Sequence, residues 1–144
     1  MFIMDIGTTP DLVSGVYKKL EENISKYRKV INRPLTLAEK ILAGHLEDID
    51  TSNDFEPGKS YVFLKPDRVA LQDVTGQMVI LQFMQSGLKR VALPSTVHCD
   101  HLIQARVGSE EDTRLALDEN SEVYKFLESA SRKFGLGFWR QVPE

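Results

Sequence analysis

Two short clusters of polar residues hold the side chains best suited to chemistry. The first is the pair Gln72 and Asp73. The second places an imidazole, a thiol, a carboxyl group and another imidazole in consecutive positions: His98, Cys99, Asp100 and His101. Each cluster follows a short β-prone run, and parallel sheets bind ligands outside the carboxyl ends of their strands. The two clusters are therefore the candidate functional residues.

The second cluster is compatible with four roles. Zinc binding is disfavoured because neighbouring strand residues point to opposite faces and zinc sites normally use gapped pairs. A nucleophilic Cys99 would need a base beside it in space, and adjacency along a strand works against that arrangement. Asp100 could instead orient His101 and fix its tautomer for proton transfer. In the fourth role, one histidine only bonds the backbone.

The first cluster has a simpler interpretation. Asp73 stands at the start of a predicted helix, where a carboxylate accepts hydrogen bonds from free backbone N–H groups. Gln72 would not stand out by its residue type alone. From the residues themselves, a helix start is thus the favoured interpretation of this pair, beside a role in the site.

The elements before these clusters are predicted to be mainly helical. Apolar residues at spacings of one, three and four predict a helix of about 22 residues that is capped by Thr9 and ends before Pro34. Thr36 and Glu39 form a capping-box pattern that opens a second, shorter helix. Residues 47–58 are acidic and rich in turn formers, which predicts a surface loop.

The middle of the chain has the order of predicted elements that is typical of a βαβ unit. Residues 60–65 and 69–71 are β-prone, and the helical spacing of residues 75–86 ends at Gly87, where a left-handed cap belongs. Residues 90–93 read as the next strand, and a further extended stretch follows them. Strand, helix and strand within so short a distance indicate parallel strands.

The last third is predicted to be helical and then extended. A helix starts near Ser109, breaks near Asn120 and ends at Gly135, after which residues 136–139 look like a strand. The whole pattern predicts an α/β fold with three layers, in which flanking helices cover a mainly parallel central sheet. A chain of this length suits a single domain over residues 1–144, with a helical lead-in and acidic loop at 1–58 and a βαβ-rich core at 59–144.

Composition excludes several classes of partner. The 144 residues carry a net charge of -3, with 18 basic and 21 acidic residues interspersed, so no nucleic-acid partner is expected. The longest apolar run is far shorter than the roughly 20 residues of a membrane span. The single cysteine, Cys99, cannot form an intrachain disulfide and indicates an intracellular context. Residues 1–9 lack the pattern of a transit peptide, so we expect any targeting segment to be absent or already removed.

Three motifs resemble those of the mitochondrial type of aconitase. Residues 68–78 read R-V-A-L-Q-D-V-T-G-Q-M, similar to the family's R-V-A-M-Q-D-A-T-A-Q-M, and L-Q-F follows shortly after in both. Residues 91–103 read V-A-L-P-S-T-V-H-C-D-H-L-I, similar to the family's V-P-S-T-I-H-C-D-H-L-I. The run N-R-P-L-T-L-A-E-K-I at 32–41 matches the family's upstream helix. The similarity keeps one register from about Tyr17 to Trp139.

The resemblance implies a hydro-lyase of the tricarboxylic acid cycle in the mitochondrial matrix. Such enzymes interconvert citrate and isocitrate through cis-aconitate, with one iron of a 4Fe–4S cluster acting as a Lewis acid on the substrate hydroxyl. By matching positions, the resemblance implies that Gln72 binds the tricarboxylate substrate. It likewise implies that Asp100 and His101 form the catalytic pair that protonates the departing hydroxyl.

The sequence also departs from the family. Aconitases hold their cluster with three cysteine thiolates from later in the chain, whereas the one cysteine here, Cys99, matches a position outside that ligand set. We therefore expect no metal ligands in this chain and no cofactor bound by it alone. Residues 140–144 replace the family's P-G-S-G-I-I-H-Q continuation. The expectation is a truncated segment, inactive by itself, that the remaining aconitase domains or a partner protein would complete.

Two functions follow from this resemblance. In the first, the chain is part of an aconitase-type hydro-lyase, folds like the first part of the aconitase core and contributes its three site residues. In the alternative, it is a non-catalytic, aconitase-derived subunit with a structural or interaction role in a larger assembly. Absorbance from thiolate-to-iron bonds, together with hydratase activity, separates the two.

Overall fold

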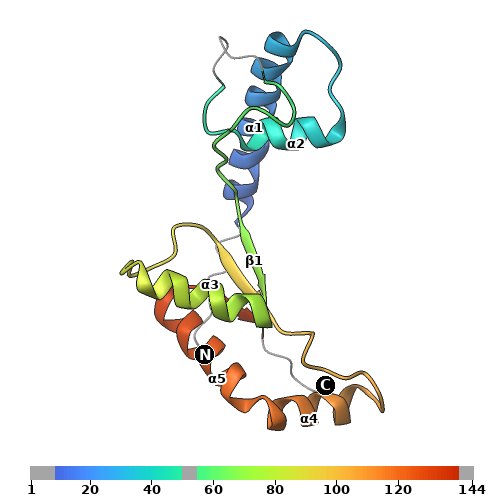
Figure 1. Ribbon diagram of the computed structural model, residues 1–144, viewed down its shortest axis with the longest axis vertical. Helices are drawn as coiled ribbons and strands as arrows, with labels where there is room; N and C mark the ends of the chain where they lie inside the picture. The colour runs from blue at the N-terminus through green and yellow to red at the C-terminus, as the bar shows by residue number, and fades with distance from the viewer. Residues whose placement is uncertain (1–8, 50–54, 140–144) are drawn as a thin grey trace. The chain divides into compact units, whose positions relative to one another are not determined.

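The computed structural model describes residues 9–49 and 55–139 and divides the chain into two compact units (Figure 1). One unit ends at Asp67 and the other continues from Arg68. Each unit has its own cluster of buried hydrophobic side chains. Compact units can still belong to one domain, so the single domain over residues 1–144 stays a prediction.

The first unit contains the two predicted helices, α1 (Pro10–Ile31) and α2 (Leu37–His45). The Thr9 hydroxyl accepts a hydrogen bond from the Leu12 N–H at 3.2 Å, and Asn32 ends α1 in the left-handed conformation. The capping box is confirmed, since the Thr36 hydroxyl and the Glu39 carboxylate each accept a backbone N–H from the other residue. These contacts explain why both helices begin where the sequence predicts.

The strand predicted at residues 60–65 is wrong. Within residues 9–49 and 55–139, this β-prone segment forms one isolated antiparallel bridge, between Leu46 and Leu64. Two backbone hydrogen bonds flank the bridge. Tyr61 and Phe63 remain 99% and 81% exposed. In the part of the chain that the structure describes, no strand pairs with this segment along its length, and β-prone residues need such pairing to form a sheet.

The second unit is an α/β fold with a parallel sheet, as predicted. Strand order follows chain order, and both strand pairs are parallel. Helices α3 and α5 contact each other as well as the sheet, so they pack together as the sheet's flanking helices. The elements are β1 (Val69–Gln72), α3 (Asp73–Gln85), β2 (Ser95–His98), α4 (Ser109–Glu119), α5 (Ser121–Phe134) and β3 (Gly137–Trp139).

One strand of this unit is displaced from its predicted position. Residues 90–93 form no strand, and β2 begins only after Pro94. The Val91 N–H donates instead to the carbonyl of Phe134, at the end of α5. The apolar run at 90–93 thus leads into the sheet without joining it. Helix α3 also starts two residues earlier than predicted, directly after β1.

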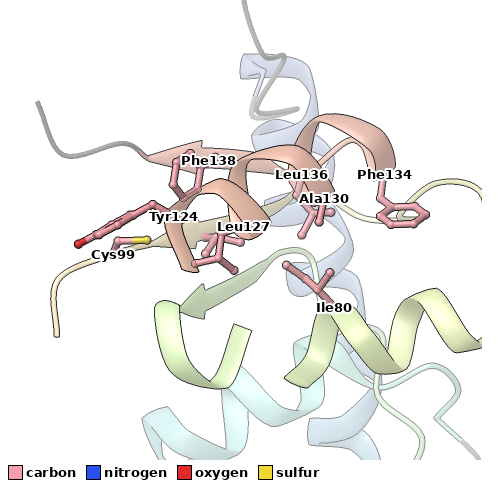
Figure 2. Close-up of a cluster of buried hydrophobic side chains, with 9 residues drawn as sticks. Ile80, Cys99, Tyr124, Leu127, Ala130, Phe134, Leu136 and Phe138 are labelled. Atoms are coloured by element: carbon pink, nitrogen blue, oxygen red, sulfur yellow. The ribbon is translucent and has the colours of Figure 1, made fainter. Parts of the chain in front are cut away.

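The core of the second unit lies between the sheet and its helices. Val97 of β2 and Phe138 of β3 pack against α5, whose Leu127 is fully buried. Figure 2 shows Phe138 and Leu127 in this cluster. Ile80 of α3 joins the same cluster. Because neighbouring strand residues point to opposite faces, Gln72, His98 and Trp139 lie on the other face of the sheet. Among the described residues, no helix combines the length and apolar character that crossing a membrane requires.

Candidate functional site

The register of β1 and β2 brings the two polar clusters to the same edge of the sheet. Gln72, the last residue of β1, lies opposite His98, the last residue of β2. The residues that follow these partners, Asp73 on one side and 99–101 on the other, therefore meet at the carboxyl edge. This is the edge at which parallel sheets bind ligands.

Asp100 and His101 form a close pair at this edge. Nδ1 of His101 lies 2.8 Å from Oδ1 of Asp100, which is a hydrogen-bonding distance. The side chain of His101 is 51% exposed, and that of Asp100 is 69% exposed. An imidazole whose Nδ1 is held by a carboxylate has its tautomer defined, and Nε2 becomes the nitrogen available for proton transfer. The pair can therefore act as an acid or base toward a bound molecule.

Asp73 is the site residue that sequence reasoning assigned only to a helix start. Its carboxylate is fully buried, and its Oδ2 accepts a hydrogen bond from the His101 N–H at 3.2 Å. Its Oδ1 accepts the Val74 N–H at 2.8 Å and lies 3.6 Å from Nδ1 of His101. Asp73 thus starts α3 and also contacts His101, which is 28 residues further along the chain. The sequence contained a sign of this contact, because both polar clusters follow strands of one βαβ unit and such strands end at the same edge of the sheet.

Gln72 lies close to this group along the sheet but is not joined to it. Its side chain is exposed, and within residues 9–49 and 55–139 it forms no hydrogen bond with Asp100 or His101. An amide at this place can both donate and accept hydrogen bonds. The structure therefore leaves Gln72 free to contact a ligand at the edge that the pair occupies.

Cys99 points away from its polar neighbours. It is buried in the core beside Tyr124 of α5 (Figure 2). Burial, followed by the nearby carboxylates of Asp73 and Asp100, raises the pKa of its thiol to about 11. Both the nucleophile and the zinc interpretations need a thiolate, and this environment disfavours one.

His98 is also separated from the pair. Its Nε2 lies 2.9 Å from the hydroxyl of Thr96, and its ring stacks on Trp139 with the centroids 5.8 Å apart. The four consecutive polar residues thus divide between a core thiol, a stacked histidine and the Asp100–His101 pair. Of the four roles that the sequence left open, the arrangement favours the oriented imidazole.

The groups of this site could together contact a cation, but not an iron–sulfur cluster. Ligand atoms of Asp73, Asp100 and His101 lie within 4.8 Å of one another, and the hydrogen bonds described above account for that proximity without an ion. Iron–sulfur clusters of this class need cysteine thiolates. The only thiol of the chain is buried in the core, so the residues present do not fit a cluster.

The sequence matches a family model along most of its length. The model of the aconitase family (aconitate hydratase) aligns with residues 39–142. The chain is 57% identical over 124 residues to the mitochondrial aconitate hydratase of Saccharomyces cerevisiae. It is 52% identical to probable mitochondrial aconitate hydratases of Dictyostelium discoideum and Caenorhabditis elegans.

These matches cover much of this chain and little of its relatives. In each of the three, the alignment spans 86% of this chain and 16% of the relative. The chain therefore spans about a sixth of the length of the relatives that it matches. The matched residues include both polar clusters and all three strands of the sheet. By family model and by identity, the chain belongs to the aconitase family (aconitate hydratase).

Proposed function

We propose that this chain supplies part of the active site of an aconitase-type hydro-lyase that acts on a tricarboxylate. The observation that carries the proposal is the Asp100–His101 pair, 2.8 Å apart and half exposed at the carboxyl edge of the parallel sheet. Loss of a hydroxyl group requires a proton, and an imidazole oriented by a carboxylate is suited to deliver it. The names of the relatives support the same reaction class.

In this proposal each residue has a defined part in the reaction. Asp100 holds Nδ1 of His101, so that Nε2 carries the proton that leaves with the hydroxyl group as water. In the return direction the same nitrogen takes a proton from the water that adds to the double bond. Gln72, exposed at the end of β1, hydrogen-bonds the substrate and fixes its position relative to the imidazole.

The remaining parts of the reaction belong to other residues of the complete enzyme. Formation of the double bond also requires a base that removes the carbon-bound proton, and we place this base and the groups that bind the substrate carboxylates outside this segment. We place the 4Fe–4S cluster and its thiolate ligands there too, because the single thiol of this chain lies in the core. The isolated 144-residue chain is inactive under this proposal. The names of the relatives, which are mitochondrial aconitate hydratases, also support a mitochondrial location.

A chimeric enzyme tests the proposed roles. The matching segment of the Saccharomyces cerevisiae relative is replaced by this chain, and hydration of cis-aconitate is measured. His101→Gln should lower kcat by about 10²- to 10⁴-fold, the range of general acid–base catalysis. Gln72→Ala should mainly raise KM, because a binding interaction made before and during the reaction is lost.

His98→Gln provides the matched control. His98 is three residues from His101 and lies outside the pair, stacked on Trp139, so this variant should retain the activity of the parent chimera. Full activity of the His101→Gln chimera would contradict the acid–base role. A folded, cluster-loaded chimera without any hydratase activity would favour the alternative, a subunit with only a structural or interaction role.

A further inference from the structure

We propose that Asp73 is a positioning residue that holds the Asp100–His101 pair in its working orientation from below the surface. The inference rests on the proposed function of that pair. It assigns to Asp73 a second role besides starting α3. The role consists of fixing the backbone of the segment after β2, to which the catalytic imidazole is attached.

The contacts of Asp73 join two elements through one carboxylate. Oδ1 accepts the N–H of Val74 in the first turn of α3, at 2.8 Å. Oδ2 accepts the N–H of His101, at 3.2 Å. Because the carboxylate is fully buried, water does not compete for either hydrogen bond. The position of His101 is thereby tied to the start of α3.

Asp100 cannot supply this restraint by itself. Its side chain is 69% exposed, and an exposed ion pair is weakened by water and by the side-chain freedom that it must give up. Asp73 also lies 3.6 Å from Nδ1 of His101, beyond hydrogen-bonding distance but close enough for electrostatic attraction. Two carboxylates therefore favour a proton on Nδ1, which leaves Nε2 to exchange a proton with the substrate. Only one of these carboxylates, that of Asp73, is buried and held by a backbone hydrogen bond on each oxygen.

Asp112 shows what a carboxylate with only a helix-start role looks like in this chain. It lies in the first turn of α4 and is also buried. Its Oδ2 accepts three backbone N–H groups, all from the segment that leads directly into its own helix. Asp73 instead reaches 28 residues along the chain to the segment that carries the catalytic imidazole. This difference separates a positioning role from local capping.

Imidazole ¹⁵N NMR of the 144-residue chain tests the inference without any enzyme activity. The chain has three histidines, so His→Gln variants assign each signal. At about pH 9, where imidazole is ordinarily neutral, His101 should carry its proton on Nδ1, and its backbone N–H should exchange slowly. Predominance of the Nε2–H form, or rapid exchange of that N–H, in the unaltered chain overturns the proposal without any further variant.

Asp73→Asn should release His101 from this state. Asparagine has one acceptor oxygen for the N–H groups of Val74 and His101. Its amino group, which is itself a donor, would face one of these N–H groups and could not accept from it. The signals should shift to a mixture of both tautomers, and the His101 N–H should exchange faster. Asp73→Ser is the second variant, because serine suits a helix start but its short side chain does not reach His101. Unchanged His101 signals in either folded variant contradict the inference.

Asp112→Asn is the matched control. It removes a buried carboxylate from the first turn of another helix, so it should speed exchange at Arg106, Val107 and Gly108 and leave the His101 tautomer unchanged. An equal change of His101 in this control would show that loss of stability in general, and not Asp73, sets the tautomer. The inference would then be wrong.

Kinetics of the chimera distinguish failure of this inference from failure of the proposed function. Asp73→Ser should lower kcat by about 10- to 100-fold, the cost of misplacing a catalytic group by a small distance, with little change in KM. If His101→Gln abolishes activity and Asp73→Ser does not alter kcat, only the positioning role fails. If His101→Gln is without effect, the proposed function fails whatever the NMR signals of the Asp73 variants show.

Discussion

Asp112 illustrates how local donors decide the charge of a buried carboxyl group in this chain. Burial raises its pKa, because a low-dielectric environment disfavours the charged form. Hydrogen bonds from the N–H groups of Val107, Gly108 and Arg106 outweigh that effect, so the pKa lies below its usual value. Asp73 is likewise buried and accepts two backbone N–H groups, which replace the hydrogen bonds that water would otherwise supply.

Glu39 gives the clearest pH dependence. A side-chain hydrogen bond from Arg33, followed by the Thr36 N–H, lowers its pKa from 4.5 to about 2. A lowered folded-state pKa means that the stabilisation is fully present above pH 4.5 and is lost as the pH falls toward about 2. We expect Glu39→Gln, which keeps the capping-box acceptor, to be less stable than the parent at neutral pH and to converge with it in acid.

Urea unfolding followed through the amide signals of α2 measures this difference. Glu128→Gln is the control, because Glu128 also pairs with an arginine, Arg132, but within another helix, α5, and outside any capping box. A stability difference between Glu39→Gln and the parent that stayed constant from neutral pH into acid would contradict the assignment of the Glu39 pKa.

Helix α3 carries more apolar surface than its contacts in this chain bury. Its large side chains include the exposed Val74, Met78, Leu81 and Met84, while Ile80 faces the core. A helix that is apolar on all sides is normally buried on all sides. This property agrees with a segment that spans 16% of its relatives, whose further residues would cover such a surface.

Gly76 of α3 offers a stabilising substitution. A Cβ at this position would lie 3.5 Å from Cβ of Leu71 and 3.6 Å from Cγ1 of Val97, which is ordinary van der Waals contact. Glycine in a helix interior costs about 0.5–1 kcal/mol relative to alanine. Gly76→Ala should therefore raise the free energy of unfolding by about that amount, measured by urea denaturation.

Gly137→Ala is the matched comparison for this prediction. Its Cβ would lie 2.9 Å from Cγ2 of the fully buried Thr96, so the strand or that side chain must move. This variant should be less stable than the parent. A loss of stability in Gly76→Ala would mean that the space around α3 is tighter than these distances indicate.

The whole molecule offers a single thiol to an iron–sulfur cluster. Its one thiol is buried in the core of the second unit, and its pKa is raised to about 11. Reconstitution of the chain with iron and sulfide should therefore yield no thiolate-to-iron absorbance after desalting, as with a Cys99→Ala variant. A stable, coloured species that depends on Cys99 would contradict this expectation.

The contact between Asp100 and His101 and several helix boundaries were predictable because they depend on neighbours in sequence. Asp100 adjoins His101, the capping box spans Thr36 and Glu39, and the left-handed glycine Gly135 directly follows the helix it ends. Their geometry is set by local backbone and side-chain contacts. The family motifs then implied which of the open chemical roles to prefer.

Only the tertiary structure decided which polar residues meet, which strand-like segments pair and which side chains are buried. Asp73 reaches His101 through the register of two strands, and Cys99 turns into the core while Asp100 stays in solvent. Residues 60–65 are β-prone without joining a sheet, because pairing depends on a neighbour elsewhere in the chain. Contacts between distant residues arise from packing, which no local pattern of residue types contains.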